Sequence, residues 1–215
     1  MKIIIARNEG KKARELYDKT GWGRMYIDRT PNPFPGEPWA WDNGAWQAHV
    51  QGKPLDIELW KHRTRLATAA PTPYMAILPD IVAGGLKSLE LSARHIDDMP
   101  LWWPKYLPVQ NGIQPHHTEP MVPKLKGIFL GGDTEYKRTA HMWAEFAHAH
   151  GLRLHYARAG TRGELRHAHD CGADSLDTAR PLWIPRQYNQ WMRWTQELQT
   201  QGAYSRKLDK TIPPQ

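Results

Sequence analysis

The sequence predicts an α/β fold in which parallel strands alternate with helices, and a TIM-barrel-like (β/α)8 architecture fits it best. Short apolar runs recur roughly eight times along the 215 residues, with helical or connecting segments between them. The clearest unit spans residues 152–181, where an apolar segment, a helical segment at Thr161–Cys171 and a second apolar segment follow one another. This order is the repeating unit of a parallel sheet. A doubly wound open sheet is the alternative, but the sequence has neither standard Gly-rich phosphate loop to favour it.

The first half of the chain supplies four of the expected strands. They are short β-branched or aromatic runs at Lys2–Ala6, Met25–Asp28, Trp39–Asp42 and Tyr74–Leu78. Helical spacing of apolar residues predicts helices at Asn8–Lys19, where Asn8 is suited to be the cap, and at Leu55–Ala69. The prolines of residues 30–38 exclude regular structure between the second and third strands.

The second half repeats the alternation. Strands are expected at Tyr106–Gln110, at Gly127–Leu130, in the apolar run after Leu152 and at Ala173–Asp177. Helices are expected at Gly85–Ile96, Glu135–His150, Thr161–Cys171 and Arg186–Gln201, with Asp133 or Thr134 as the cap of the second. We therefore expect a single catalytic domain at residues 1–203 and a mobile tail at residues 204–215, which has little to bury.

Composition narrows the classes of function. A net charge of +7 and a pI near 9.5 favour a polyanionic partner. The single cysteine, Cys171, excludes a disulfide framework and a cysteine-based zinc site. The start of the chain does not have the apolar run of a signal peptide, and no stretch approaches about 18 apolar residues. We therefore expect a soluble intracellular protein that does not enter a membrane.

The eleven histidines raise the question of a metal site. Metal ions need convergent ligands, and neither a His-Glu-x-x-His motif nor a two-histidine, one-carboxylate pattern occurs. We expect no bound metal.

Polar residues or glycines end five of the expected strands. They are Asp42, Asp80, Gln110, the pair Gly131–Gly132, and Asp177. In a barrel all five points face the same mouth, where ligands of this fold bind. A lone aspartate at a strand end is more often a turn former or a helix cap, and Asp42-Asn43-Gly44 is also a tight-turn signal. Several acids meeting at one mouth indicate a bound ligand or chemistry that uses them, because their mutual repulsion otherwise costs stability.

These strand ends resemble a known family. Asp-Asn-Gly-Ala-Trp at 42–46, Pro-Asp at 79–80, Val-Gln-Asn-Gly at 109–112, Phe-Leu-Gly-Gly at 129–132 and Asp-Ser-Leu-Asp at 174–177 resemble, in order and spacing, motifs of the queuine/archaeosine tRNA-guanine transglycosylases. The resemblance covers about residues 39–180. The zinc-binding cysteines and histidine of the tRNA enzymes have no counterpart, their C-terminal region is missing, and the first motif differs. The short, zinc-free chain is more similar to the phage and bacterial DNA-guanine transglycosylases, which exchange guanine in DNA for a 7-deazaguanine.

The resemblance implies roles for these residues. Asp177 would be the nucleophile that forms a covalent glycosyl-enzyme ester, and Asp42 the general acid/base. Asp80 would read the guanine edge, while Gln110 and the backbone of Gly131 and Gly132 would hold its carbonyl side. It implies no cofactor and no zinc, a free 7-deazaguanine base as co-substrate, and a location in the cytoplasm of a bacterial or phage-infected cell. Asp174 stays open between a structural and a functional acid.

A base within a duplex is out of reach, so the resemblance also implies a single-stranded substrate or a flipped base. Phosphate contacts are expected from Arg158, Arg162, Arg180 and Arg186, and stacking from Trp46, with Trp102, Trp103 and Trp183 as further candidates. For each of these a solvated basic face or a core aromatic is the alternative. The other functions left open are a tRNA-guanine transglycosylase, an N-glycoside hydrolase using the same carboxylates, and a non-catalytic nucleic-acid-binding barrel.

Overall fold

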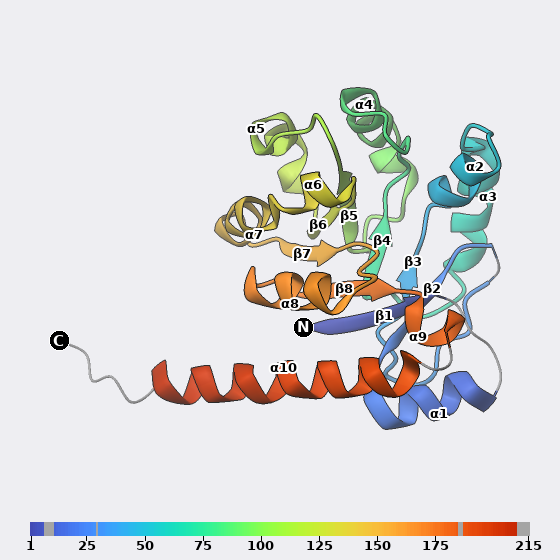
Figure 1. The fold of residues 1–215 in the computed structure, drawn as a ribbon. Coiled ribbons are helices and arrows are strands. Elements are labelled where there is room, and N and C mark those ends of the chain that lie inside the picture. The colour runs from blue at the N-terminus through green and yellow to red at the C-terminus, as the bar shows by residue number, and fades with distance from the viewer. Residues whose placement is uncertain (7–10, 29, 185–186, 210–215) are drawn as a thin grey trace.

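Eight parallel strands close into a barrel in the computed structural model of the chain, which confirms the (β/α)8 prediction over the open sheet (Figure 1). The structure describes residues 1–6, 11–28, 30–184 and 187–209. The strands are β1 (Lys2–Ala6), β2 (Gly23–Tyr26), β3 (Ala40–Trp41), β4 (Met75–Ile77), β5 (Lys105–Val109), β6 (Gly127–Leu130), β7 (Arg153–Tyr156) and β8 (Ser175–Thr178). They follow one another around the barrel in chain order, and β1 pairs with β8 to complete the ring.

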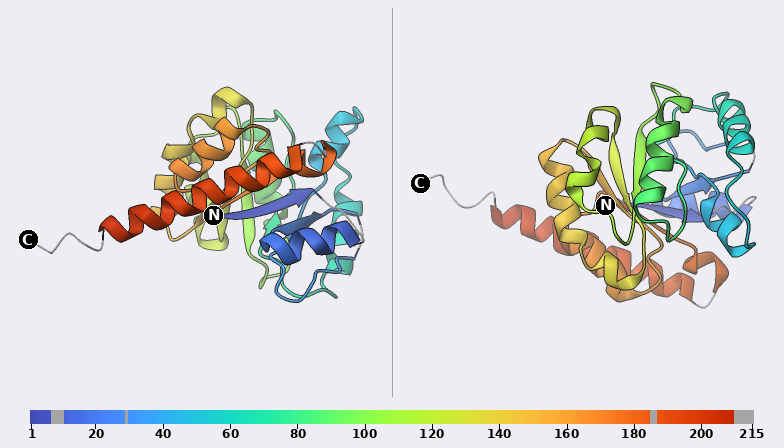
Figure 2. Two further views of the ribbon diagram at one scale, coloured as in Figure 1. Left: turned by 60° about the horizontal axis from the view of Figure 1, so that its bottom comes forward. Right: turned by 90° about the horizontal axis from the view of Figure 1, so that it is seen from above.

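Helices form the layer outside the barrel (Figure 1). They are α1 (Lys11–Thr20), α2 (Ala45–Val50), α3 (Ile57–Ala67), α4 (Leu86–His95), α5 (Pro115–Thr118), α6 (Thr134–Lys137), α7 (Ala140–Ala149), α8 (Arg162–Asp170), α9 (Arg180–Trp183) and α10 (Tyr188–Asp209), with 3-10 turns η1 (Ile96–Asp98) and η2 (Glu119–Lys124). Helix α10 runs along the outside of the barrel, and its C-terminal part extends beyond the strands (Figure 2). Among the described residues no helix combines the length and apolarity needed to cross a membrane.

The prediction of one long helix at Glu135–His150 is wrong, because the structure has two helices there, α6 and α7. The break falls at Thr139, whose hydroxyl donates a hydrogen bond to the Tyr136 carbonyl at 2.6 Å. A threonine bonded to the preceding turn competes with the helical hydrogen-bond ladder. Asp133 is the cap of α6, since its side chain accepts a hydrogen bond from the Tyr136 N–H at 2.8 Å.

Two further differences concern α2 and α10. Residues 45–50, for which the sequence predicted no helix, form α2 after Gly44, whose φ of 85° suits glycine. Helix α10 ends at Asp209 rather than Gln201, so part of the tail expected at 204–215 is helical. The expected cap Asn8 and residues 210–215 lie outside the described residues.

The barrel interior forms an apolar cluster of its own, separate from the layer between strands and helices. It contains one or two side chains from each of β1 to β6, namely Ile4, Met25, Ala40, Met75, Ile77, Tyr106 and Phe129. Their neighbours along each strand, such as Ile5, Trp41 and Leu107, belong instead to the outer cluster beneath the helices. This alternation follows from the period of two along a strand.

Most of the tryptophans whose side chains are described serve the outer cluster. Trp22, Trp39, Trp41, Trp60, Trp103, Trp143 and Trp191 are buried. Trp103 was expected to be available for stacking on a base, but its ring packs edge-on against Trp39 and Trp41 in the core. The high tryptophan content is therefore mainly a property of the core.

Glycine at position 127 is required by the packing of the barrel interior. A Cβ built on Gly127 would overlap the ring of Tyr106, which is completely buried. We expect Gly127→Ala to lower the free energy of unfolding by about 2 kcal/mol, because the ring has no room to move. Gly163→Ala, on the exposed side of α8 where the nearest atom to a new Cβ is 3.8 Å away, should instead stabilise by about 0.5 kcal/mol. Urea unfolding of both variants measures this, and an unchanged Gly127→Ala midpoint would contradict it.

Candidate active site at the mouth of the barrel

Three aspartates meet at the C-terminal mouth of the barrel. Asp42 directly follows β3, Asp80 follows β4 after a Leu-Pro pair, and Asp177 is the last but one residue of β8. Asp42 and Asp177 each come two residues after an inward position, Ala40 and Ser175, so their side chains also point inward. All three are only partly exposed.

Asp42 carries the largest change in acidity of the three. Burial raises the pKa of its carboxyl from the ordinary 3.8 to about 7, and the negative charges of Asp177 and, to a smaller extent, Asp80 add to the rise. Hydrogen bonds from the backbone N–H groups of Gly44 and Asn43, the latter at 2.8 Å, oppose it. The electrostatic effect of Asp177 on Asp42 shows that residues far apart in sequence share one site.

Asp80 is bound to the loop that carries Asp42. Burial raises the pKa of Asp80 to about 6, whereas a hydrogen bond from Asn43 and the positive charge of Arg158 act in the opposite direction. The Asn43 amide donates to Asp80 Oδ1 at 2.8 Å and to the Leu78 carbonyl at 2.6 Å. Sequence reasoning treated Asn43 as part of a turn and missed this link between two loops.

Asp177 is held by a histidine that the sequence analysis did not single out. His155 Nε2 lies 2.9 Å from Asp177 Oδ1, and the backbone N–H of Arg158 donates to the same oxygen at 3.0 Å. His155 Nδ1 lies 2.8 Å from Ser175 Oγ. The alternation of inward and outward side chains along the Arg153–Tyr156 strand could have predicted that His155 points into the barrel. Ser175 is completely buried, so this serine–histidine–aspartate chain does not present a serine nucleophile to a substrate.

The Arg158 side chain crosses the mouth above the acids. It starts after β7, donates from Nη2 to the Gly132 carbonyl after β6 at 3.0 Å, and places its guanidinium 4.3 Å from the centre of the Trp46 ring in α2. Figure 1 shows β3, which leads into α2, on the other side of the barrel from β6 and β7. Arg158 and Trp46, both expected as nucleic-acid contacts, are thus brought together over the candidate site.

A buried ion pair holds the loop that carries Arg158. Lys137 Nζ lies 2.6 Å from Glu164 Oε1 and 3.4 Å from the Arg158 carbonyl. The other oxygen of Glu164 accepts a hydrogen bond from the Gly160 N–H at 2.8 Å. Arg158 itself has a φ of 52°, a conformation that side chains other than glycine adopt at a cost, so the loop is held against local strain.

Gln110 lies at the same mouth, but its amide is engaged by the protein. Its Oε1 accepts a hydrogen bond from the Ala83 N–H at 2.6 Å and its Nε2 donates to the Ile81 carbonyl at 2.7 Å. The Gln110 side chain therefore holds the loop after β4 through two of its backbone groups.

Gly131 and Gly132 follow β6 at the same rim. The Gly131 N–H donates to the Val109 carbonyl at 2.8 Å. Gly132 has a φ of 80°, and a Cβ there would lie 2.7 Å from the Tyr136 ring and 2.8 Å from Asn111 Oδ1, so only glycine fits.

The other described residues expected to contact nucleic acid do not gather at the mouth. Arg162 pairs with Glu197 of α10 at 2.8 Å, which ties α8 to α10 rather than pointing into the mouth. Arg180 is exposed just after β8, with its guanidinium beside Gly160. Arg186 and the Trp183 side chain lie outside the described residues.

Asp174 lies at the start of β8, away from the mouth. Its Oδ2 accepts a hydrogen bond from the Leu154 N–H at 2.8 Å and is 3.2 Å from His148 Nε2. These contacts join β7, β8 and α7, so the structural reading of Asp174 fits its position.

A surface cavity of about 370 Å³ lies beside the segments that precede β4 and β5, at the opposite end of the barrel. It is lined by Thr64, Arg65, Thr68, Asp97, Asp98, Met99, Pro100, Leu101 and Trp102. None of the strand-end residues is part of it. Trp102, another expected stacking residue, therefore belongs to the far end of the molecule.

Within the part of the chain that the structure describes, no group of three or more His, Cys, Asp or Glu side chains is arranged to hold a metal ion. No protein-family model matches the chain, and a search of curated proteins finds no match. Fold and site together define a TIM-barrel-like protein with three carboxylates at the end of the barrel where enzymes of this fold bind their substrates.

The raised pKa of Asp42 makes stability depend on pH. The folded protein keeps the Asp42 proton up to about pH 7, whereas the unfolded chain releases it near pH 3.8, so this group lowers stability as pH rises from about 4 to about 7. Asparagine cannot ionise. We expect the free energy of unfolding of Asp42→Asn to exceed that of the unmodified protein by about 2 kcal/mol above pH 7. At pH 4 the two values should differ little.

Unfolding in urea at a series of pH values measures this difference. Asp18→Asn, on the exposed face of α1, is the matched control and should show no rise with pH. A constant difference between Asp42→Asn and the unmodified protein from pH 4 to pH 8 would contradict the buried, protonated state of Asp42.

Proposed function

We propose that this protein is a DNA-guanine transglycosylase, which exchanges guanine in DNA for a 7-deazaguanine base by double displacement. The observation that carries the proposal is the presence of two different carboxyl groups at one mouth. Asp42 has a pKa of about 7, which the charge of Asp177 helps to raise, and Asp177 Oδ1 is hydrogen-bonded to His155 and to the Arg158 N–H. One carboxyl is able to give or take a proton near neutral pH, and the other, held by these hydrogen bonds, is the nucleophile. Two carboxylates with different roles are what glycosyl transfer with retention requires.

In the first half of the reaction, Asp177 attacks the anomeric carbon of the target nucleotide. The bond from C1′ to N9 of guanine breaks, and its electron pair leaves with the base. The protonated Asp42 donates a proton to the departing guanine, which leaves as the neutral base. The sugar remains attached to Asp177 through an ester bond, and Asp42 is now a carboxylate.

In the second half, a 7-deazaguanine occupies the place of guanine. The Asp42 carboxylate takes the proton from its N9, and N9 attacks C1′. The ester bond to Asp177 breaks and its electrons return to the carboxylate. Both aspartates regain their starting states, so the cycle needs no metal ion, oxidant or cofactor.

Recognition of the base is assigned to the residues around these two acids. Ionised Asp80 would accept hydrogen bonds from the ring N–H and the amino group of guanine, a pair of donors that adenine does not offer. In the structure the Arg158 side chain lies at the same rim, bonded to the Gly132 carbonyl and beside the Trp46 ring, and we expect it to leave these contacts when DNA binds. Its guanidinium and the exposed Trp46 ring would then be free to contact a phosphate and a neighbouring base.

The charge favours a nucleic acid as the partner, and the resemblance favours DNA over transfer RNA. The net charge of +7 favours a polyanion, and the short, zinc-free sequence is more similar to the DNA-modifying than to the tRNA-modifying transglycosylases. An N-glycoside hydrolase would use the same two carboxylates with water as the second acceptor, and experiment separates the two.

Incubation of guanine-containing single-stranded DNA with isotope-labelled 7-deazaguanines tests the proposal. We expect label in the DNA and release of one guanine for each base incorporated. A covalent protein–DNA complex should be seen on a denaturing gel when the incoming base is omitted. Asp177→Asn should lower the rate by a factor of about 10⁴ or more, because the amide is not a nucleophile.

Parallel reactions distinguish the alternatives. Label in transfer RNA but not in DNA would assign the tRNA reaction, and abasic sites without label would assign hydrolysis. Salt-dependent DNA binding without base release, retained in the Asp42→Ala/Asp177→Ala double variant, would identify a binding module instead. Full exchange by Asp177→Asn would show that the nucleophile is another group.

The pKa of Asp42 predicts opposite pH profiles for the two half-reactions. Guanine release needs protonated Asp42, so its rate should fall as pH rises above about 7. Incorporation from the isolated covalent complex needs the carboxylate, so its rate should fall as pH drops. The fall should begin below pH 7, because the esterified Asp177 has lost the charge that helps to raise the pKa of Asp42. Single-turnover rates between pH 5.5 and 8.5 measure both, and parallel profiles would exclude Asp42 as the shared acid and base.

A further inference from the structure

His155 is a completely buried histidine that lies directly beneath Asp177. It stands on β7 opposite Ser175 of β8, and both side chains point into the barrel. Its imidazole stacks on the Phe129 ring, with centroids 4.9 Å apart and planes inclined by 9°. With both ring nitrogens hydrogen-bonded and one face covered, the ring has a single orientation.

The partners of the ring determine where its proton lies. The carboxylate of Asp177 only accepts hydrogen bonds, so Nε2, at 2.9 Å from Oδ1, must carry a hydrogen. In a neutral imidazole Nδ1 is then an acceptor, and the Ser175 hydroxyl at 2.8 Å donates to it. Ser175 thus selects the tautomer that donates to Asp177.

Both donors to Asp177 act on the same oxygen. Oδ1 accepts from His155 Nε2 and from the Arg158 backbone N–H at 3.0 Å. Among the described residues, no hydrogen bond or ion pair engages Oδ2. A carboxyl group otherwise rotates easily about its terminal torsion, and two donors on one oxygen prevent that. The second oxygen is left to attack.

We propose that His155 is a positioning residue, which holds Asp177 so that Oδ2 faces the anomeric carbon, and that Ser175 acts through it by setting its tautomer. This role rests on the proposed base exchange. His155 itself lies beneath the carboxylate and touches no substrate. Its effect is on how often Asp177 stands in the attacking orientation, and therefore on kcat more than on the binding of DNA or base.

A pair of substitutions at position 155 separates positioning from packing. Leucine fills much of the space but cannot donate a hydrogen bond, whereas the amide of glutamine reaches about as far as Nε2 and does donate. We expect His155→Leu to lower kcat of exchange about 100-fold with KM values for DNA and base changed less than about 3-fold. His155→Gln should recover most of the loss, and Ser175→Ala should lower kcat about 10-fold.

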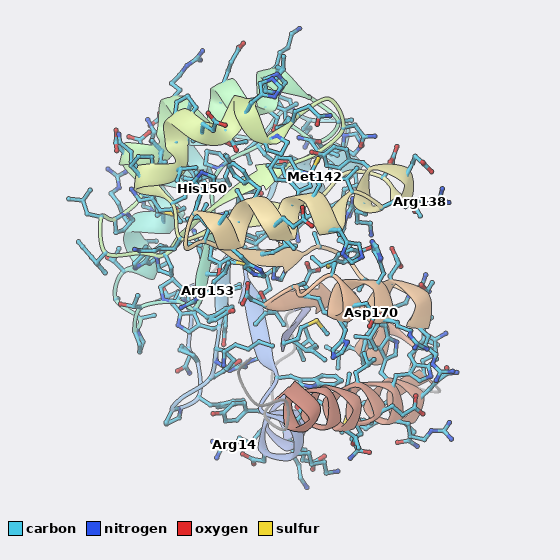
Figure 3. All side chains as sticks on the ribbon, turned by 90° about the vertical axis from the view of Figure 1, so that its left-hand side faces the viewer. Arg14, Arg138, Met142, His150, Arg153 and Asp170 are labelled. Atoms are coloured by element: carbon cyan, nitrogen blue, oxygen red, sulfur yellow. The ribbon has the colours of Figure 1, made fainter. Side chains whose placement is uncertain are left out.

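The formation rate of the covalent protein–DNA complex reports on the same step without the second substrate. It should fall in His155→Leu and recover in His155→Gln. His150→Leu is the matched control, since His150 lies at the far end of α7 in the outer helical layer (Figure 3) and should leave both rates unchanged. Thermal unfolding of each variant identifies changes that come from loss of folded protein.

The outcomes separate the two proposals. If the unmodified protein forms neither exchanged DNA nor the covalent complex, the proposed function is wrong and the role of His155 is wrong with it. If it forms both and His155→Leu matches its kcat, only the role of His155 is wrong. Equal losses in the leucine and glutamine variants would likewise reject positioning through the Nε2 hydrogen bond.

Discussion

The pairing of β1 with β8 is the constraint on which the rest of the structure depends. It places Ile4 opposite Asp177 and closes the eight strands into one ring. Closure brings the ends of β3, β4 and β8 to a common mouth, although they are widely separated in the chain. An open sheet of the same strands would leave the first and last strand at opposite edges, and Asp177 would have no influence on Asp42.

The barrel interior is divided by polarity. Apolar side chains such as Met75, Tyr106 and Phe129 fill it from β1 to β6, whereas β7 and β8 contribute His155, Ser175 and Asp177. Burial of carboxyl groups costs free energy, and the raised pKa of Asp42 is the visible sign of that cost. The tryptophan-rich layer outside the strands supplies the compensating apolar burial. Carboxyl groups with pKa values raised in this way make the mouth a candidate functional site.

The rim of the barrel is rigid because its loops are tied to one another by side chains. Asn43 joins the loop after β3 to Asp80, and Gln110 binds two backbone groups of the loop after β4. The ion pair between Lys137 and Glu164 holds the loop after β7. These bonds fix the carboxylates in the free protein, and the proposed reaction would need little reorganisation of the mouth. The Arg158 side chain is exposed and is anchored at the rim by the Gly132 carbonyl and the Trp46 ring.

The sequence by itself determined the alternation of strands and helices, the (β/α)8 class, and the acids at the strand ends, because these depend on local periodicity and on chain order. It did not determine the break at Thr139, the second role of Asn43, the engagement of Gln110 by the backbone, or the burial of Trp103, since each depends on a partner from another element. His155 shows most clearly what the sequence determines and what the tertiary structure adds. Its inward position follows from a period of two, but its contacts with Ser175 and Asp177 exist only because β7 and β8 pair in one register. Hydrogen bonds and electrostatic effects act over a few ångströms in space, and only the closed barrel sets those distances.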